Sequence, residues 1–167
     1  MDQKKENIKY HTKVKHIILE NYLKAWYSII MKRYNAALYI DGFCGSGSNS
    51  ENEKGSPIIA LDIARVIAEK NNLKKFYYIF IDYNKTNIEL LKNTVENKNY
   101  PNNMIIYFIN ENFEQSINKV MDKINYENLE IPSFAFIDPY GYTQIPYNTI
   151  KRLISKSSAE ILINLMW

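Results

Sequence analysis

The chain has 167 residues, which is enough for one domain with a hydrophobic core and too few for two ordinary domains. Its 46% hydrophobic and 23% charged residues are typical of a globular protein and exclude a disordered, fibrous or repeat protein, while a net charge of +3 permits nucleic acid as a partner without requiring it. No apolar run approaches the roughly 20 residues of a membrane helix, and the charged N-terminus does not resemble a secretory signal, so we expect a cytoplasmic protein without membrane contact.

Cysteine and histidine are too scarce for two common kinds of stabilising site. Cys44 is the one cysteine, so an internal disulfide is excluded, and His11 and His16 are the only imidazoles. A structural zinc ion usually needs four such ligands. We therefore expect no metal site.

The predicted secondary structure alternates between helices and short apolar strands. In the first helix, apolar residues recur at three- and four-residue intervals, namely Val14, Ile17, Ile18, Trp26, Ile29 and Ile30. Ser56 and Pro57 indicate a second helix start, with serine as the N-cap. In chain order we predict a helix over about 12–33, a strand over 36–40, a helix over about 56–70, a strand over 76–81, a helix over about 86–97, a strand over 104–109, a helix from 113, a strand over 133–137, a short helix over about 146–155 and a strand over 160–165.

Five apolar strands that alternate with helices favour the α/β class, with one open parallel sheet covered by helices on both faces. The expected strand order is 3-2-1-4-5, in a single domain over 1–167 with the N-terminal helix at about 12–33 and the core at about 36–167. Ligands bind such sheets at the carboxyl ends of the strands, beside the switch point. Three predicted strands end there in an aspartate: Asp41, Asp82 and Asp138.

The loop after the first strand carries glycines in the order G-x-x-G-x-G, at Gly42, Gly45 and Gly47. A dinucleotide site has the order G-x-G-x-x-G and a helix that begins at once to meet the phosphates, whereas here about nine residues intervene. This spacing disfavours an enzyme of nucleotide phosphates and suits S-adenosyl-L-methionine, which has no phosphate. Glycine is also the default residue of any tight turn, so the loop by itself leaves a structural turn open.

Each part of that cofactor has candidate partners in the sequence. The glycines and Phe43 would line the methionine portion, and Asp41 would either attract its ammonium group or anchor the loop. Asp82, at the end of the second strand, is predicted to accept both ribose hydroxyls. Asn112 and Phe113, after the third strand, are the candidates for the adenine pocket. Cys44 lies in the same loop without a nearby histidine, so we expect a small buried side chain there and no nucleophile.

The fourth strand ends in Asp138, Pro139, Tyr140 and Gly141, which resembles the D-P-P-Y arrangement of methyltransferases that act on base amines. In this interpretation Asp138 and Pro139 orient the amine, and the ring of Tyr140 stacks on the acceptor. The second proline of D-P-P-Y is absent here, which brings the ring one residue closer to the acid. The other interpretation is a proline–glycine turn with an exposed phenol.

An ordered set of sequence blocks resembles the three-Cys-motif partner family, TcmP. The blocks are 11–19, 22–26, 39–47, 55–61 and 136–141. The resemblance implies a bacterial protein with a Rossmann-like, class I methyltransferase-like domain, associated with a separate partner that carries three cysteines. Two departures are Cys44, where alanine is usual, and an end at Trp167 where family members continue. Lys15 resembles the lysine that meets the cofactor's carboxylate in some DNA methyltransferases, although a solvated helix face explains it equally well.

A complete methyltransferase sheet continues after the fifth strand with a hairpin of strands 6 and 7, which this sequence lacks. We therefore expect a C-terminally truncated domain whose fifth strand has an exposed edge that pairs with another chain. The leading hypothesis is an S-adenosylmethionine-dependent methyltransferase domain acting on a nucleic-acid base amine. The alternative is a catalytically silent module of the same fold that acts by binding another protein.

Overall fold

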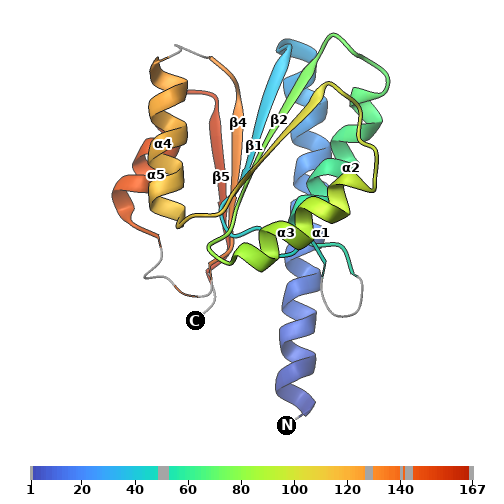
Figure 1. Ribbon diagram of the computed structural model, residues 1–167, viewed down its shortest axis with the longest axis vertical. Coiled ribbons are helices and arrows are strands. Elements are labelled where there is room, and N and C mark those ends of the chain that lie inside the picture. Colours follow the sequence, from blue (N-terminus) through green and yellow to red (C-terminus); the bar gives the residue numbers. More distant parts are fainter. Residues whose placement is uncertain (1, 49–52, 127–129, 140, 142–144, 166–167) are drawn as a thin grey trace.

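The computed structural model describes residues 2–48, 53–126, 130–139, 141 and 145–165 of the chain (Figure 1). The strands are β1 (Ala36–Asp41), β2 (Lys75–Ile81), β3 (Met104–Ile109), β4 (Ser133–Ile137) and β5 (Ala159–Ile163). The helices are α1 (Asp2–Arg33), α2 (Ser56–Ala68), α3 (Lys85–Glu96), α4 (Phe113–Tyr126) and α5 (Tyr147–Leu153).

The described strands form one parallel sheet in the order β3-β2-β1-β4-β5, which confirms the predicted class and strand order. In the centre, β1 pairs with β2 on one side and with β4 on the other, so that Asp41 lies opposite Phe80 and Phe136. After β3 at one edge of the sheet, the chain returns to the centre and forms β4 on the other side of β1. This reversal of strand order leaves a crevice at the carboxyl ends of the strands.

The sheet separates two hydrophobic layers. Helices α1, α2 and α3 cover one face, and α4 and α5 cover the other (Figure 1). The central strands are buried on both faces, which explains why β1 and β4 read as unbroken apolar runs. Aromatic side chains fill the α1 side, where Tyr39 and Phe134 stack with ring centroids 6.0 Å apart.

The first helix differs from its prediction in two respects. It begins at Asp2, ten residues before Thr12, and its buried stripe agrees with the expected one only in part, since Trp26 is buried as predicted. Ile17, Ile18 and Ile29 are more than half exposed. The buried positions follow the helical repeat at Leu19, Leu23, Trp26, Tyr27 and Met31. Isoleucines occur on several faces of this helix, so periodicity alone placed Ile17, Ile18 and Ile29 wrongly, while Trp26 and Ile30 do pack on the core.

The remaining boundaries agree with the predictions to within about two residues, and the largest differences are the ends of the second helix at Ala68, of the short helix at Leu153 and of the fifth strand at Ile163. At α2 the N-cap is Gly55, and Ser56 is already helical, so the predicted serine cap is wrong by one residue. The residues of β5 are all half-buried. Among the described residues, no helix is both long and apolar enough to span a membrane.

Candidate functional site

Two neighbouring cavities open at the carboxyl ends of the strands. The larger, of about 610 Å³, is lined by Gly42, Phe43, Asp82, Tyr83, Asn84, Asn87, Glu111, Asn112, Phe113, Glu114 and Pro146. The smaller, of about 260 Å³, is lined by Thr12, His16, Phe43, Cys44, Gly45, Ser46, Gly47, Ser48, Glu53, Gly55, Ser56, Asn87 and Asp138. Phe43 and Asn87 line both, so the two cavities adjoin.

The glycine loop lies between β1 and these cavities, and the space around its three glycines differs. Gly45 and Gly47 have positive φ angles of 61° and 79°, which favour glycine. A Cβ on Gly45 would meet open space, so the backbone is accessible there. A Cβ on Gly47 would lie 2.5 Å from Leu91, and one on Gly42 would lie 2.7 Å from Phe113. Gly42 and Gly47 are therefore required for packing.

Asp82 lies on the wall of the larger cavity and also holds the loop in place. Its Oδ2 accepts hydrogen bonds from the amide of Gly45 at 2.9 Å and from the side chain of Asn87 at 3.2 Å. Its Oδ1 accepts from the amide of Asn84 at 2.7 Å. Each carboxylate oxygen has two acceptor positions, so Oδ1 retains one for a ligand. Asp82 thus joins the glycine loop to the start of α3.

The residues expected at the adenine end also line the larger cavity. Phe113 is buried and stacks against Phe43, with ring centroids 5.2 Å apart, to form an aromatic wall. Asn112 is exposed, and its Oδ1 accepts from the amide of Gln115 at 2.9 Å, which caps α4. Its side-chain amide group is the part that remains suited to reading a base edge.

Asp138 lines the smaller cavity, immediately after β4. Lys15 of α1 forms an ion pair with its Oδ2, and the side chain of Asn164 donates to its Oδ1 at 2.6 Å. The side chains of Lys15 and Asp138 are each 15% exposed. Pro139 is buried, and the predicted Tyr140 lies outside the described residues. The structure therefore unites Lys15 with Asp138, which the sequence had assigned to separate roles.

Asp41 is fully buried behind the glycine loop and lines neither cavity, so it is not placed to contact a ligand's ammonium group directly. The hydroxyl of Tyr39 lies 3.3 Å from its Oδ2, while Oδ1 has no hydrogen-bond partner among the described residues. Burial raises the pKa of Asp41 to about 7, although Ser56 and the Phe43 amide favour the charged form. Of the two predicted roles, anchoring the loop fits this position.

Cys44 and His16 complete the smaller cavity. Cys44 is buried, as expected, and burial raises the pKa of its thiol far above the usual range, which leaves it unreactive. His16 follows Lys15 on α1, and burial together with the charge of Lys15 lowers its pKa. A neutral imidazole at neutral pH therefore faces the glycine loop.

Sequence reasoning missed several residues that line the cavities, among them His16, Tyr83, Asn87 and Pro146. Tyr83 adjoins Asp82 directly. Asn87 lies one helical turn after the Asn84 cap, so its contact with Asp82 follows from the helix repeat. His16 follows Lys15, which the sequence analysis did consider for the site, but no pattern in the sequence marked the histidine itself.

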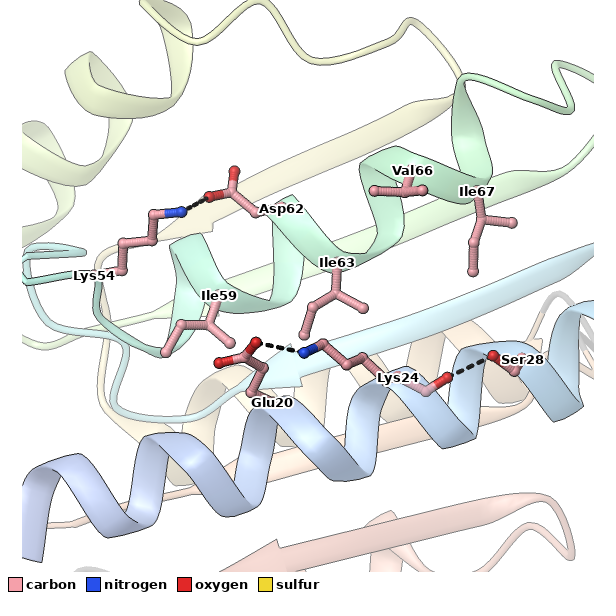
Figure 2. A pocket seen from close by; sticks show the side chains of 9 residues that line it. All are labelled: Glu20, Lys24, Ser28, Lys54, Ile59, Asp62, Ile63, Val66 and Ile67. Atoms are coloured by element: carbon pink, nitrogen blue, oxygen red, sulfur yellow. Dashed lines mark hydrogen bonds and ion pairs between the residues drawn. The ribbon is translucent and has the colours of Figure 1, made fainter.

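A further groove of about 440 Å³ lies between α1 and α2, away from the site (Figure 2). Its walls include Ile59, Ile63 and Ile67, and its charged residues already pair with each other or with neighbours. Lys24 binds Glu20 at 2.6 Å, and Lys54 binds Asp62 at 2.7 Å. The groove therefore does not present the convergent polar groups of a catalytic site.

Among the described residues, no group of three or more histidine, cysteine, aspartate or glutamate side chains is arranged to hold a metal ion. No protein-family model matches the chain, and no curated protein matches it significantly. A solved structure described as a conserved hypothetical protein of Streptococcus pyogenes is similar, with 15% sequence identity, a TM-score of 0.46 and coverage of 83% of this chain and 72% of that one.

Proposed function

We propose that this chain is a Rossmann-like methyltransferase domain that binds S-adenosylmethionine at the carboxyl edge of its sheet. The observation that carries the proposal is the pair of adjoining cavities separated by Phe43 and Asn87, with Asp82 on the larger and the glycine loop on the smaller. S-adenosylmethionine likewise has two unequal halves, a nucleoside and an amino acid, which are joined through sulfur. The TcmP resemblance of the sequence blocks points in the same direction.

The residues present fit the cofactor. The larger cavity offers an aromatic wall of Phe43 and Phe113 for the base, the amide group of Asn112 for its edge, and an acceptor position on Asp82 for ribose. The smaller cavity offers accessible backbone at Gly45 for the amino-acid end. When bound, S-adenosylmethionine supplies a methyl group activated on a sulfonium.

Asp138 is the residue that we assign to the methyl acceptor, together with Pro139 and Tyr140. Its carboxylate lines the smaller cavity at the switch point, where an acceptor would meet the sulfur end of the cofactor. A displacement at carbon needs alignment of the acceptor amine more than acid or base assistance, and Asp138 can supply that alignment by accepting its N–H. A nucleic-acid base amine is the acceptor class that the D-P-Y sequence suggests.

Calorimetry with S-adenosylmethionine and S-adenosylhomocysteine tests the cofactor proposal. We expect binding by the wild-type chain, and a loss of about 1–3 kcal/mol of binding free energy in Asp82→Ala, because hydrogen bonds to a charged group disappear. Asp82→Asn is the matched control, since it keeps one acceptor oxygen and should lose less. An affinity unchanged in Asp82→Ala would remove Asp82 from the site, and no heat with either ligand would contradict the proposal.

A second candidate function is a silent module that binds another protein, such as a three-cysteine partner. A specific observation favours it: Ile18, Tyr22 and Ile29 form an exposed apolar stripe on α1, with Ile29 68% exposed. The hydroxyl of Tyr22 donates to Glu160 of β5, so this stripe adjoins the edge strand of the sheet.

Introducing positive charge into the apolar stripe separates the two candidate functions. In sedimentation velocity of the chain mixed with a three-cysteine protein encoded beside it, the double variant Ile18→Lys/Ile29→Lys should abolish the complex while leaving S-adenosylhomocysteine binding intact. Val66→Lys, at an equally exposed site on α2, should leave the complex unchanged. A complex that survives both changes would exclude the stripe as the interface.

A further inference from the structure

Strand β3 forms one outer edge of the sheet and has none of the features that usually keep an edge strand unpaired. Among the described strands it pairs with β2 alone. Edge strands in natural proteins usually carry a lysine, a proline or a bulge that blocks further pairing. Strand β3 has the sequence MIIYFI, and the whole segment 99–110 contains no charged residue. The other outer strand, β5, carries Glu160. The edge of β3 is therefore the one suited to accept a further strand.

The backbone groups on this open edge follow from the pairing of β3 with β2. The amide of Phe76 in β2 donates to the carbonyl of Asn103 at 2.9 Å, and Ile106 lies opposite Tyr78. Because backbone groups alternate in direction along a strand, those of Ile106 and Phe108 point away from β2. Among the described residues these outward groups have no backbone partner, so the edge presents amide donors and carbonyl acceptors in alternation.

The side chains along this edge are apolar on both faces of the sheet. Ile106 and Phe108 pack on the layer formed with α1, α2 and α3. On the other face Tyr107, which is 51% exposed, lines a cavity of about 510 Å³ together with Tyr77 of β2. Lys123 is the one charged residue among the described residues that line this cavity. A strand added at the edge would therefore bury apolar surface as well as form backbone hydrogen bonds.

We propose that two copies of this chain pair through β3, antiparallel and related by a two-fold axis, so that their five-stranded sheets join into one. In an antiparallel pair, opposite residues exchange N–H···O=C bonds, so the outward amides of Ile106 and Phe108 in each copy meet outward carbonyls of the other. A two-fold axis sets the same surface against itself. Like charges on that surface would repel, and an edge without charge avoids this repulsion, which makes a second copy the fitting partner.

This pairing leaves the candidate site of each copy open. The strands of one copy all run in the same direction, and antiparallel pairing at β3 turns those of the second copy the opposite way. The carboxyl edges of the two sheets therefore face opposite directions, and each copy keeps its own pair of cavities. The dimer goes beyond the proposed function and does not depend on it.

Sedimentation velocity of the full chain between about 1 and 100 µM tests the dimer. We expect a dimer that forms as the concentration rises. Tyr107→Lys should weaken it roughly tenfold or more, because each copy then brings an ammonium group to the shared interface. Ile106→Pro should also weaken it, because this change removes an outward amide and no hydrogen bond to β2. Ile154→Lys, at the 53% exposed C-cap of α5, is the matched control and should dimerise as the wild-type chain does.

Amide hydrogen exchange of the wild-type chain shows whether β3 forms the interface. The amides of Ile106 and Phe108 should gain protection as the concentration rises, while those of Ile105 and Tyr107, which face β2, should be protected at every concentration. Circular dichroism establishes that each variant is folded.

Three results would overturn the dimer. They are a chain that stays monomeric over the whole range, a dimer in which exchange at Ile106 and Phe108 does not change, and a folded Tyr107→Lys chain that dimerises as well as Ile154→Lys. Binding of S-adenosylhomocysteine is measured separately by calorimetry, so a failure of the dimer leaves the proposed function standing, and the reverse also holds.

Discussion

Asp41→Asn is expected to be more stable than the wild-type chain at pH 8, and the advantage should disappear as the pH falls towards 4. Asp41 is fully buried, and burial raises its pKa from 3.8 to about 7. Its protonated form is therefore the one that the folded state favours. The stability that this preference contributes is fully present below pH 3.8 and is lost as the pH rises through about 7.

The size of the effect follows from the difference between the two pKa values. At about 1.36 kcal/mol per pKa unit, ionising Asp41 costs the folded state about 4 kcal/mol above pH 7. Urea unfolding of both chains between pH 4 and 8 measures it, and the difference between them cancels the opposite contribution of the half-buried His16. An Asp41→Asn chain that is less stable at pH 8, with the wild-type pH slope, would contradict this account.

Asp62→Asn is the matched control for Asp41. Partial burial alone would raise its pKa, but hydrogen bonds from Lys54 and Tyr100 outweigh burial and lower it. Its contribution is therefore present above pH 3.8 and is lost as the pH falls. We expect Asp62→Asn to lower the free energy of unfolding near neutral pH, the opposite direction to Asp41→Asn.

Gly47→Ala is expected to lower the free energy of unfolding by about 2–5 kcal/mol. The positive φ of 79° costs an alanine roughly 1–2 kcal/mol. A Cβ there would also lie 2.5 Å from Cδ1 of the fully buried Leu91, which would have to shift, and overpacking of this kind adds roughly 1–3 kcal/mol.

Gly45→Ala is the control that separates the two contributions. Its φ of 61° imposes a similar backbone cost, but a Cβ there meets no atom within 4 Å. We expect a loss of about 1–2 kcal/mol in guanidinium unfolding, from the backbone alone. Equal losses in the two variants would show that the contact with Leu91 contributes nothing.

Strand order and the position of the site edge could be predicted because they follow from the alternation of elements. Apolar runs buried on both faces, each separated by a helix, leave few topologies, and the ends of β2 and β4 then bring Asp82 and Asp138 to one edge. The face of α1 could not be predicted in this way. Ile17, Ile18 and Ile29 satisfy a helical repeat as well as Leu19 and Leu23 do, and only contact with the sheet decides between them.

The contacts within the site could not be predicted, since they join residues that are distant in the sequence. Lys15 and Asp138 are 123 positions apart, and Gly45 and Asp82 are 37 apart. The burial of Asp41 could not be predicted from the sequence either. A carboxylate at a strand end suggests a ligand site. In the structure the Asp41 side chain is instead buried next to Phe43 of the glycine loop and Ser56, the first residue of α2, and it stabilises the loop.

The central claim, that both cavities at the carboxyl edge receive one cofactor, is tested most directly by backbone amide shifts of the ¹⁵N-labelled chain titrated with S-adenosylhomocysteine. The largest shifts should fall on amides beside the two cavities, at Gly45, Gly47, Asn84 and Phe113. Shifts confined to the groove between α1 and α2, at Ile59, Ile63 and Val66, or an unchanged spectrum at saturating ligand, would contradict it.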